Sequence, residues 1–232
     1  MRRCFLPEAR CVSTSEGADE WLDLAEWPPP TAPRLLHLHP RGALREETPV
    51  GSQPDHYRYD PRDPTPDVGG NMDPGFGSRD NRKLEARADV LTYTTDPLPT
   101  DLDIIGRATA TLYVRSSLKH TDFFVRLCDV HGQRAKSMNV CDGVVRLGPD
   151  TGERQADGTR RITIELWPNA HRFKSGHRVR LQVSSGSHPR YARNLGSGEP
   201  VATTTRYRVA DQELSHDPDH PSAIALPVHR ST

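Results

Sequence analysis

The chain has 232 residues, which is long enough to bury a core as one large domain or as one domain with a tail. Its 31 lysines and arginines balance 31 aspartates and glutamates, so no overall charge favours nucleic acid or an anionic membrane as a partner. A hydrophobic content of 34%, with 21 prolines and 17 glycines, indicates a loop-rich β protein rather than a helical bundle.

The N-terminal sequence lacks the pattern of a targeting segment. In "MRRCFLPEARC" only Phe5 and Leu6 form an apolar step, which is shorter than the apolar region of a signal peptide. No stretch of the sequence approaches the run of about 18 apolar residues that a membrane span requires. We therefore expect a cytoplasmic protein that does not contact a membrane.

Two short helices are predicted in the first half of the chain. Residues 19–27, "DEWLDLAEW", can form two turns before three prolines end them. Residues 78–90 can form a second helix, with Ser78 or Asp80 as its N-cap. Between them, residues 40–78 are rich in proline, glycine and aspartate and predict a long ordered loop.

Period-two alternation of apolar and polar residues is the dominant signal further along the chain. Residues 122–130 and 135–147 indicate a hairpin with a continuing strand, and residues 222–228 a closing strand. The pattern predicts a β-sandwich with one core between two antiparallel sheets. In the third alternating strand, Arg178, Arg180 and Gln182 are expected to face outward. The residues expected to face inward are Ala108, Ala110, Leu112 and Val114; Ile162, Ile164 and Leu166; and Val179, Leu181 and Val183.

The four cysteines, Cys4, Cys11, Cys128 and Cys141, show no C-x-x-C spacing, so a zinc knuckle is not expected. A two-residue loop at positions 132–133 would place Cys128 opposite residue 137. Cys141 then lies too far along its strand to reach Cys128 without a bulge. Thiols are therefore expected rather than a disulfide.

No catalytic residue is assigned from the sequence. The G-x-S-x-G nucleophile elbow of the α/β-hydrolases is absent, because no glycine is followed two positions later by serine. Ser187 and His188 are adjacent, and adjacent side chains of an extended segment point to opposite faces. A serine nucleophile needs its imidazole within hydrogen-bond distance, so we interpret "SSGSH" as a turn at the end of a strand.

Ligand-binding signals are weak as well. His37 and His39 share a face of a predicted strand, and His56 or Asp60 is a conceivable third ligand, but the sequence does not place either beside them. Solvated or capping histidines are the favoured interpretation, and neither a metal nor a cofactor is predicted. The Asp-Pro repeats of residues 59–67 predict turns in which aspartate side chains accept backbone N–H groups. Basic residues are dispersed over outward strand faces, which argues against nucleic-acid binding.

Seven segments in chain order resemble one protein family. They are "GADEWLDLAEWPPP" (17–30), "YDPRDPTPDVGG" (59–70), "RADVLTYTTDPL" (87–98), "DFFVRLCDV" (122–130), "CDGVVRL" (141–147), "GHRVRLQVSSGSHPRYARN" (176–194) and "HPSAIALPV" (220–228). Together they resemble the C-terminal non-catalytic domain of X-Pro dipeptidyl-peptidases, cocaine esterase and α-amino-acid ester hydrolases. The resemblance implies an all-β jelly-roll sandwich of galactose-binding-like topology over residues 17–232. Residues 1–16 are expected to form a divergent, disordered segment without the usual preceding strand.

The resemblance also implies a function. In this family the serine, aspartate and histidine of the triad belong to a preceding α/β-hydrolase domain, and the jelly roll helps close the cleft and supports dimer formation. The chain is expected to begin almost where the jelly roll starts, so a separately encoded catalytic domain or self-association is the expected partner. A docking surface should then leave an apolar patch near Trp21, Trp27 and residues 68–76.

Two sets of residues are singled out by the resemblance. Asn71, Met72, Asp73 and Phe76 correspond to a cleft-facing loop that in relatives can add apolar contacts to the acyl pocket, although "NMDPGFGSRDN" is shorter and more polar here. A structural motif comprises Pro189, Tyr191, Arg193 and Asn194. Arg193 and Asn194 are expected to hold neighbouring loops through backbone carbonyls and carboxylates.

Three alternative functions remain open. They are a free-standing carbohydrate-binding sandwich, an enzyme with a non-standard site, and a degenerate hydrolase fragment. The first rests on fold analogy alone, and the low aromatic content of 6% offers few rings for stacking on sugars.

Overall fold

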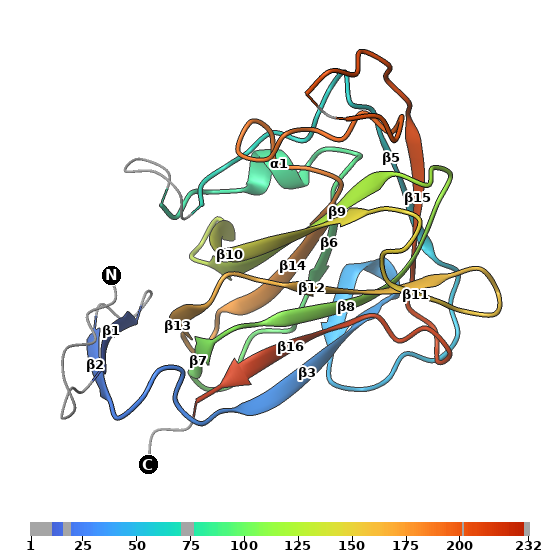
Figure 1. Ribbon diagram of the computed structural model, residues 1–232. Helices are drawn as coiled ribbons and strands as arrows, with labels where there is room; N and C mark the ends of the chain where they lie inside the picture. Colours follow the sequence, from blue (N-terminus) through green and yellow to red (C-terminus); the bar gives the residue numbers. More distant parts are fainter. Residues whose placement is uncertain (1–10, 16–19, 71–76, 201, 230–232) are drawn as a thin grey trace.

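Strands account for most of the regular structure. The computed structural model describes residues 11–15, 20–70, 77–200 and 202–229 (Figure 1). In these residues one short helix, α1 (Arg82–Glu85), and the 3-10 turn Pro40–Gly42 accompany the strands. The strands are β1 (Cys11–Ser15), β2 (Glu20–Leu24), β3 (Ala32–His39), β4 (Ala43–Arg45), β5 (Asp55–Tyr59), β6 (Leu91–Thr94), β7 (Leu102–Gly106), β8 (Thr109–Ser116), β9 (Thr121–His131), β10 (Lys136–Leu147), β11 (Glu153–Arg154), β12 (Arg160–Glu165), β13 (Asn169–Phe173), β14 (Arg178–Ser184), β15 (Ala210–Ser215) and β16 (Ala223–Val228).

The strands form two layers of a jelly-roll β-sandwich (Figure 1). One layer has the order β10-β9-β14-β6, and the other contains β3-β16-β8-β12. Strand β4 links the layers at one edge, because it pairs antiparallel with β3 and forms one parallel bridge with β6. Strand β15 pairs with both β5 and β8, and β7 pairs with β13 and β16. The predicted sandwich of two sheets is confirmed.

The predicted inward faces form the core between the layers. All ten apolar residues expected to face inward on the three alternating strands are buried. Gln182 was expected to face outward, and this was wrong, since the residue is only 2% exposed. The outer face of β14 is covered by the segment around α1, where Gln182 Nε2 donates to Glu85 Oε1 at 2.8 Å. A segment that packs on the outer face of a sheet buries the polar side chains of that face, and the alternation of the strand stays unchanged.

The predicted helix over residues 19–27 was wrong. Residues 20–24 form β2, which pairs antiparallel with β1, a strand that was not expected in the N-terminal segment. Leu24 packs beside Ile105 and Ala170, with Trp27 against the same small cluster. Pairing with β1 satisfies the backbone groups of this segment and overrides its weak helical tendency.

The second predicted helix is present but short. Its N-cap is Asn81 instead of Ser78 or Asp80. Asp80 nevertheless accepts a hydrogen bond from the backbone N–H of Arg82 at 3.2 Å. The long loop expected over residues 40–78 is interrupted by β4 and β5, so that expectation was only partly right.

The hairpin that contains Cys128 has a longer turn than predicted. Lys136 pairs with His131 across a four-residue connection, which places Asn139 opposite Cys128. A bulge between Asn139 and Cys141 then shifts the register. Both cysteines are buried thiols, as predicted, although the predicted register was wrong.

Candidate functional site

Arg126 is a fully buried cation in the middle of β9. Its neighbours along the strand face the core, so its side chain leaves the sheet on the other face. There Nη1 donates to the carbonyl oxygen of Val68 and to Asn81 Oδ1, both at 2.8 Å. Nη2 lies 3.1 Å from Asp67 Oδ1 and 3.4 Å from Asp142 Oδ2. One strand residue thus holds segments from three other parts of the chain.

Arg190 adds a second buried cation to the same place. Its Nη2 lies 2.5 Å from Asp142 Oδ1, and its Nε lies 3.7 Å from Asp67 Oδ1. The guanidinium also lies over the Tyr191 ring, 4.8 Å from the centroid. Two carboxylates and two guanidiniums balance in charge, which is the condition under which buried ions are tolerated.

Ser187 completes this cluster. Its Oγ donates to Asp67 Oδ1 at 2.5 Å and lies 3.5 Å from Arg126 Nη2. The hydroxyl therefore bonds to a carboxylate, and the Nδ1 atom of His188 is buried with no partner among the described residues. This is the geometry of a structural serine. We call the side chains of Asp67, Arg126, Asp142, Ser187 and Arg190 the Arg126 network.

The Arg126 network lies at the base of the segment that was predicted to face the cleft. Gly70 N–H donates to the carbonyl oxygen of Gly77 at 3.0 Å, closing the two stems. A Cβ at Gly70, where φ is +137°, would collide with the Arg190 guanidinium. Glycine at this position lets the chain pass directly over the network. The predicted loop residues themselves, Asn71, Met72, Asp73 and Phe76, lie outside the described residues.

The segment of residues 189–194 ties two further loops to the same end of the sandwich. Arg193 Nη1 donates to the carbonyl oxygen of Pro61 at 3.0 Å. Asn194 Nδ2 donates to Asp122 Oδ1 at 2.8 Å. These are a backbone carbonyl and a carboxylate, the two kinds of acceptor expected from the sequence. The segment therefore connects the turn after β5 with the start of β9.

Tyr191 lines a shallow groove beside the Arg126 network. Pro189 is exposed, whereas the Tyr191 N–H donates to the carbonyl oxygen of Ser187 at 2.9 Å and the Tyr191 ring is half-buried. The groove has a volume of about 450 Å³ and a mixed apolar and charged lining. Trp167, which is 50% exposed, is its largest apolar side chain. The lining residues are Arg107, Gly143, Val144, Val145, Thr163, Ile164, Glu165, Trp167 and Tyr191.

The tryptophans expected at a docking surface differ in exposure. Trp21 is 71% exposed, whereas Trp27 is half-buried against Leu24 and its neighbours. Trp167, an aromatic residue that the sequence did not single out, is more exposed than Trp27.

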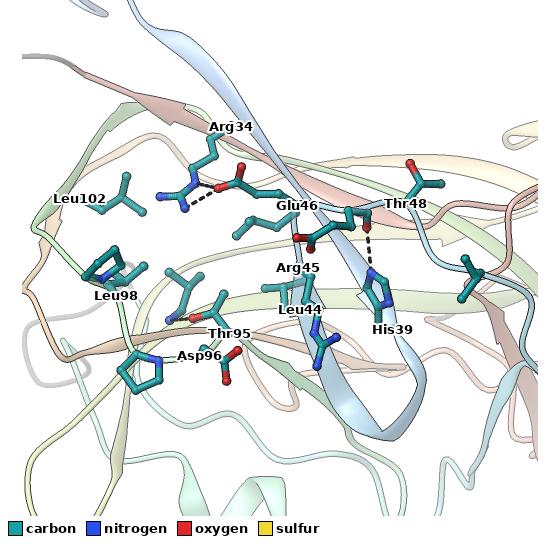
Figure 2. A pocket seen from close by; sticks show the side chains of 16 residues that line it. Arg34, His39, Leu44, Arg45, Glu46, Thr48, Thr95, Asp96, Leu98 and Leu102 are labelled. Atoms are coloured by element: carbon teal, nitrogen blue, oxygen red, sulfur yellow. Dashed lines mark hydrogen bonds and ion pairs between the residues drawn. The ribbon is translucent and has the colours of Figure 1, made fainter.

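A second groove, with a volume of about 780 Å³, lies between the β3–β4 hairpin and the segment after β6 (Figure 2). Figure 2 shows bonds from two of its polar side chains within the wall: Arg34 Nη2 lies 2.5 Å from Glu46 Oε1, and His39 Nε2 lies 2.8 Å from the Glu47 carbonyl oxygen. Thr95 Oγ1 accepts the Val179 N–H at 3.0 Å. The Thr95 hydroxyl and the His39 imidazole of this groove are therefore held in bonds within the wall.

The histidines considered as a metal half-site do not meet a third ligand. His39 bonds to a backbone carbonyl, while His37 is buried in β3. His56 is exposed on β5, and Asp60 Oδ1 accepts the N–H of Arg62 at 2.9 Å in the predicted kind of aspartate turn. Among the described residues, the group of three whose possible ligand atoms all lie within 4.8 Å of one another is elsewhere, at Asp129, His131 and His177.

The sequence did not predict that Arg126, Asp67, Asp142 and Arg190 form one cluster. A signal was present, because Arg126 is a charged residue within a strand that is otherwise mostly apolar. Such a residue is buried only when it is paired. Its partners come from distant segments, so no local pattern identifies them.

Comparison with known proteins assigns the chain to a protein family. The family described as X-Pro dipeptidyl-peptidase C-terminal non-catalytic domain matches residues 7–225. The chain belongs to this family. It is 33% identical over 234 residues to cocaine esterase from Rhodococcus sp., covering 91% of this chain and 40% of that protein.

Solved structures of similar proteins have the same fold. The domain superimposes on an α-amino acid ester hydrolase with a TM-score of 0.83 and 26% identity, covering 94% of this chain and 41% of the other. An aminopeptidase from a marine sediment Thaumarchaeota archaeon gives a TM-score of 0.80 and 25% identity, covering 94% and 40%. The X-Pro dipeptidyl-peptidase C-terminal domain seen here thus spans about 40% of the length of these relatives.

In the described part of the domain, every helix is too short and too polar to cross a membrane. The cytoplasmic location expected from the sequence stays a prediction.

Proposed function

We propose that this domain is the accessory part of an α/β-hydrolase that acts on esters or X-Pro peptides. The observation that carries the proposal is the Arg126 network, which holds both stems of residues 71–76 at one end of the sandwich. Burying charged side chains costs desolvation free energy, even when the charges balance. A cluster of this kind beside a loop is best explained if the function of the protein requires the loop to keep its position. The family resemblance supports a position for this loop at the cleft.

In this proposal the domain binds the catalytic domain and shapes the active-site cleft. The catalytic triad comes from the catalytic domain. Asn71, Met72, Asp73 and Phe76 line the acyl side of the cleft, where Met72 and Phe76 contribute apolar contact. The catalytic domain belongs to the same polypeptide or to a separate chain, and self-association adds a second copy. The apolar side chains of the shallow groove beside the Arg126 network, which Trp167 and Tyr191 line, support docking at this end of the sandwich.

The test is complementation. The chain is co-expressed with the catalytic part of the Rhodococcus cocaine esterase, from which the matching C-terminal region has been removed. We expect a 1:1 complex by size-exclusion chromatography with light scattering, and ester hydrolysis that neither half shows alone. Trp167→Ser should weaken the complex, whereas Leu35→Ser, at a side chain of β3 that is 46% exposed, should not.

A loop variant separates docking from cleft shaping. Phe76→Ala should leave the complex intact and change kcat/KM for esters with bulky acyl groups more than for acetyl esters. Absence of both complex and activity would overturn the proposal. A complex whose kinetics ignore Phe76→Ala would overturn the role of the loop alone.

A further inference from the structure

Three histidines surround Asp129 at one end of the sandwich. Asp129 and His131 lie two residues apart at the end of β9, on the face that carries the core residues of this strand. His177 Nδ1 lies 2.9 Å from Asp129 Oδ1, and His131 Nδ1 lies 3.6 Å from the same oxygen. His171 Nε2 lies 3.1 Å from Asp129 Oδ2. The four side chains come from β9, β13 and the turn before β14.

The spacing fits a tetrahedral metal ion. One ligand atom from each of Asp129, His131 and His177 lies within 4.8 Å of the others. Zinc holds nitrogen and oxygen ligands at about 2.0–2.2 Å, so neighbouring ligand atoms of a tetrahedral site are about 3.3 Å apart. The distances of 2.9 and 3.6 Å to the aspartate oxygen bracket this value. Two of the three ligand-to-ligand distances are therefore close to those of a tetrahedral site.

Two further observations indicate a built site. The His131 and His177 rings stack with centroids 4.7 Å apart and planes 21° apart, which aligns both Nδ1 edges with the same carboxylate. The His131 Nδ1 atom is buried and forms no hydrogen bond with any described atom. A buried imidazole nitrogen without a hydrogen bond is costly, and a metal ligand bond would satisfy it.

His171 has a different role in this cluster. It engages the other aspartate oxygen, and its ring packs edge-on against Phe173, 4.6 Å between centroids. It is 7% exposed, so its orientation is set by packing. A partner of this kind fixes the direction of a ligating carboxylate. We propose that Asp129, His131 and His177 bind a Zn²⁺ ion and that His171 orients the aspartate.

The ligand set predicts the preference of the site. Two imidazoles and one carboxylate suit Zn²⁺, Ni²⁺ or Cu²⁺, whereas Ca²⁺ and Mg²⁺ prefer sites made of oxygen. The side chains of His131 and His177 are 34% and 23% exposed, which leaves the ion an entry path and room for a water as fourth ligand. The ion would tie the β9–β10 hairpin to the turn before β14.

The test measures metal binding by the whole chain after tag removal and EDTA treatment. Zn²⁺ is titrated by calorimetry, and Co²⁺ is used as a spectroscopic probe of coordination. We expect one tight Zn²⁺ per chain, a tetrahedral Co²⁺ absorption band and no displacement by millimolar Mg²⁺. Zinc at 100-fold excess over Kd should raise the Tm by about 5–10 °C.

Variants locate the ion. His131→Ala should lower the affinity for Zn²⁺ at least tenfold and abolish the Co²⁺ band, and His177→Gln provides the same comparison if the first variant does not fold. His56→Ala removes an exposed histidine on β5 and should change the affinity less than twofold. Equal binding by the parent and both ligand variants, or an octahedral Co²⁺ spectrum, would overturn the site. Because the readouts are binding and Tm, this result is independent of the hydrolase proposal.

Discussion

Ser187 Oγ donates a hydrogen bond of 2.5 Å to Asp67 Oδ1, joining residues 120 positions apart in the chain. The bond connects the segment after β14 with the stem of residues 71–76. The serine beside His188, which has the composition of a hydrolytic pair, therefore supports a loop. Its hydroxyl bonds to the carboxylate instead of the imidazole.

Removing this hydroxyl should affect stability and leave chemistry unchanged. Ser187→Ala deprives buried Asp67 of a donor, which should cost about 1–3 kcal/mol in the free energy of unfolding. Urea denaturation measures the change. Ester hydrolysis by the purified chain should be undetectable before and after the substitution, and activity that disappears in Ser187→Ala would contradict the structural role.

Breaking the Arg126 network should be more damaging. Arg126→Met leaves Asp67 and Asp142 buried beside fewer cations, so the free energy of unfolding should fall by about 3–5 kcal/mol. The matched control is Arg58→Met, because the Arg58–Asp211 pair is exposed, with side-chain exposures of 70% and 59%. That substitution should leave the free energy of unfolding close to that of the parent, because an exposed ion pair contributes little. Similar losses for both variants would show that burial does not matter here.

The acid stability of the chain should depend on Asp55. Burial acts to raise the pKa of Asp55, but hydrogen bonds with His216 Nε2 at 2.9 Å and Tyr93 Oη at 2.6 Å outweigh it and lower that pKa. A carboxyl with a lowered pKa in the folded state stabilises the fold above its unfolded pKa, near 4, and loses this effect as the pH falls through the folded pKa.

The change that tests this is Asp55→Asn. At about pH 6 the variant should unfold at a lower urea concentration than the parent, and the difference should shrink as the pH falls below about 4. Asp96→Asn, whose side chain is 90% exposed, serves as the control and should follow the parent at every pH. A difference that stays constant from pH 6 to pH 3 would contradict the assignment.

The thiol of Cys128 should be inert in the folded protein. Burial raises the pKa of Cys128 to about 12, so the reactive thiolate is scarce at neutral pH. In a Cys4→Ser, Cys11→Ser variant, the disulfide reagent DTNB should modify neither Cys128 nor Cys141 until denaturant is added. Rapid modification without denaturant would contradict the packing around β9 and β10.

The alternation within β8 and β12 was enough to predict their buried faces, because a strand places every second side chain on one side whatever its partner is. For residues 19–27 the local pattern led to a wrong prediction. Their local pattern permits a helix, and pairing with β1 decided for a strand. The Cys128 hairpin lies between these cases, since the strands were recognised while turn length and the bulge set the register.

By itself, the sequence determined the class of fold, the inward faces of the main strands and, through seven ordered motifs, the family. These features depend on local periodicity and on the identity of short segments. The tertiary structure alone decided where charged and polar groups meet. Asp67 reaches Arg126 only when the segment that contains Asp67 and Val68 covers the outer face of β9, and His131 reaches His177 only when β9 pairs with β14. Burial and distance between remote residues have no local signal in the sequence. Both proposed sites depend on contacts between residues that are remote in the sequence.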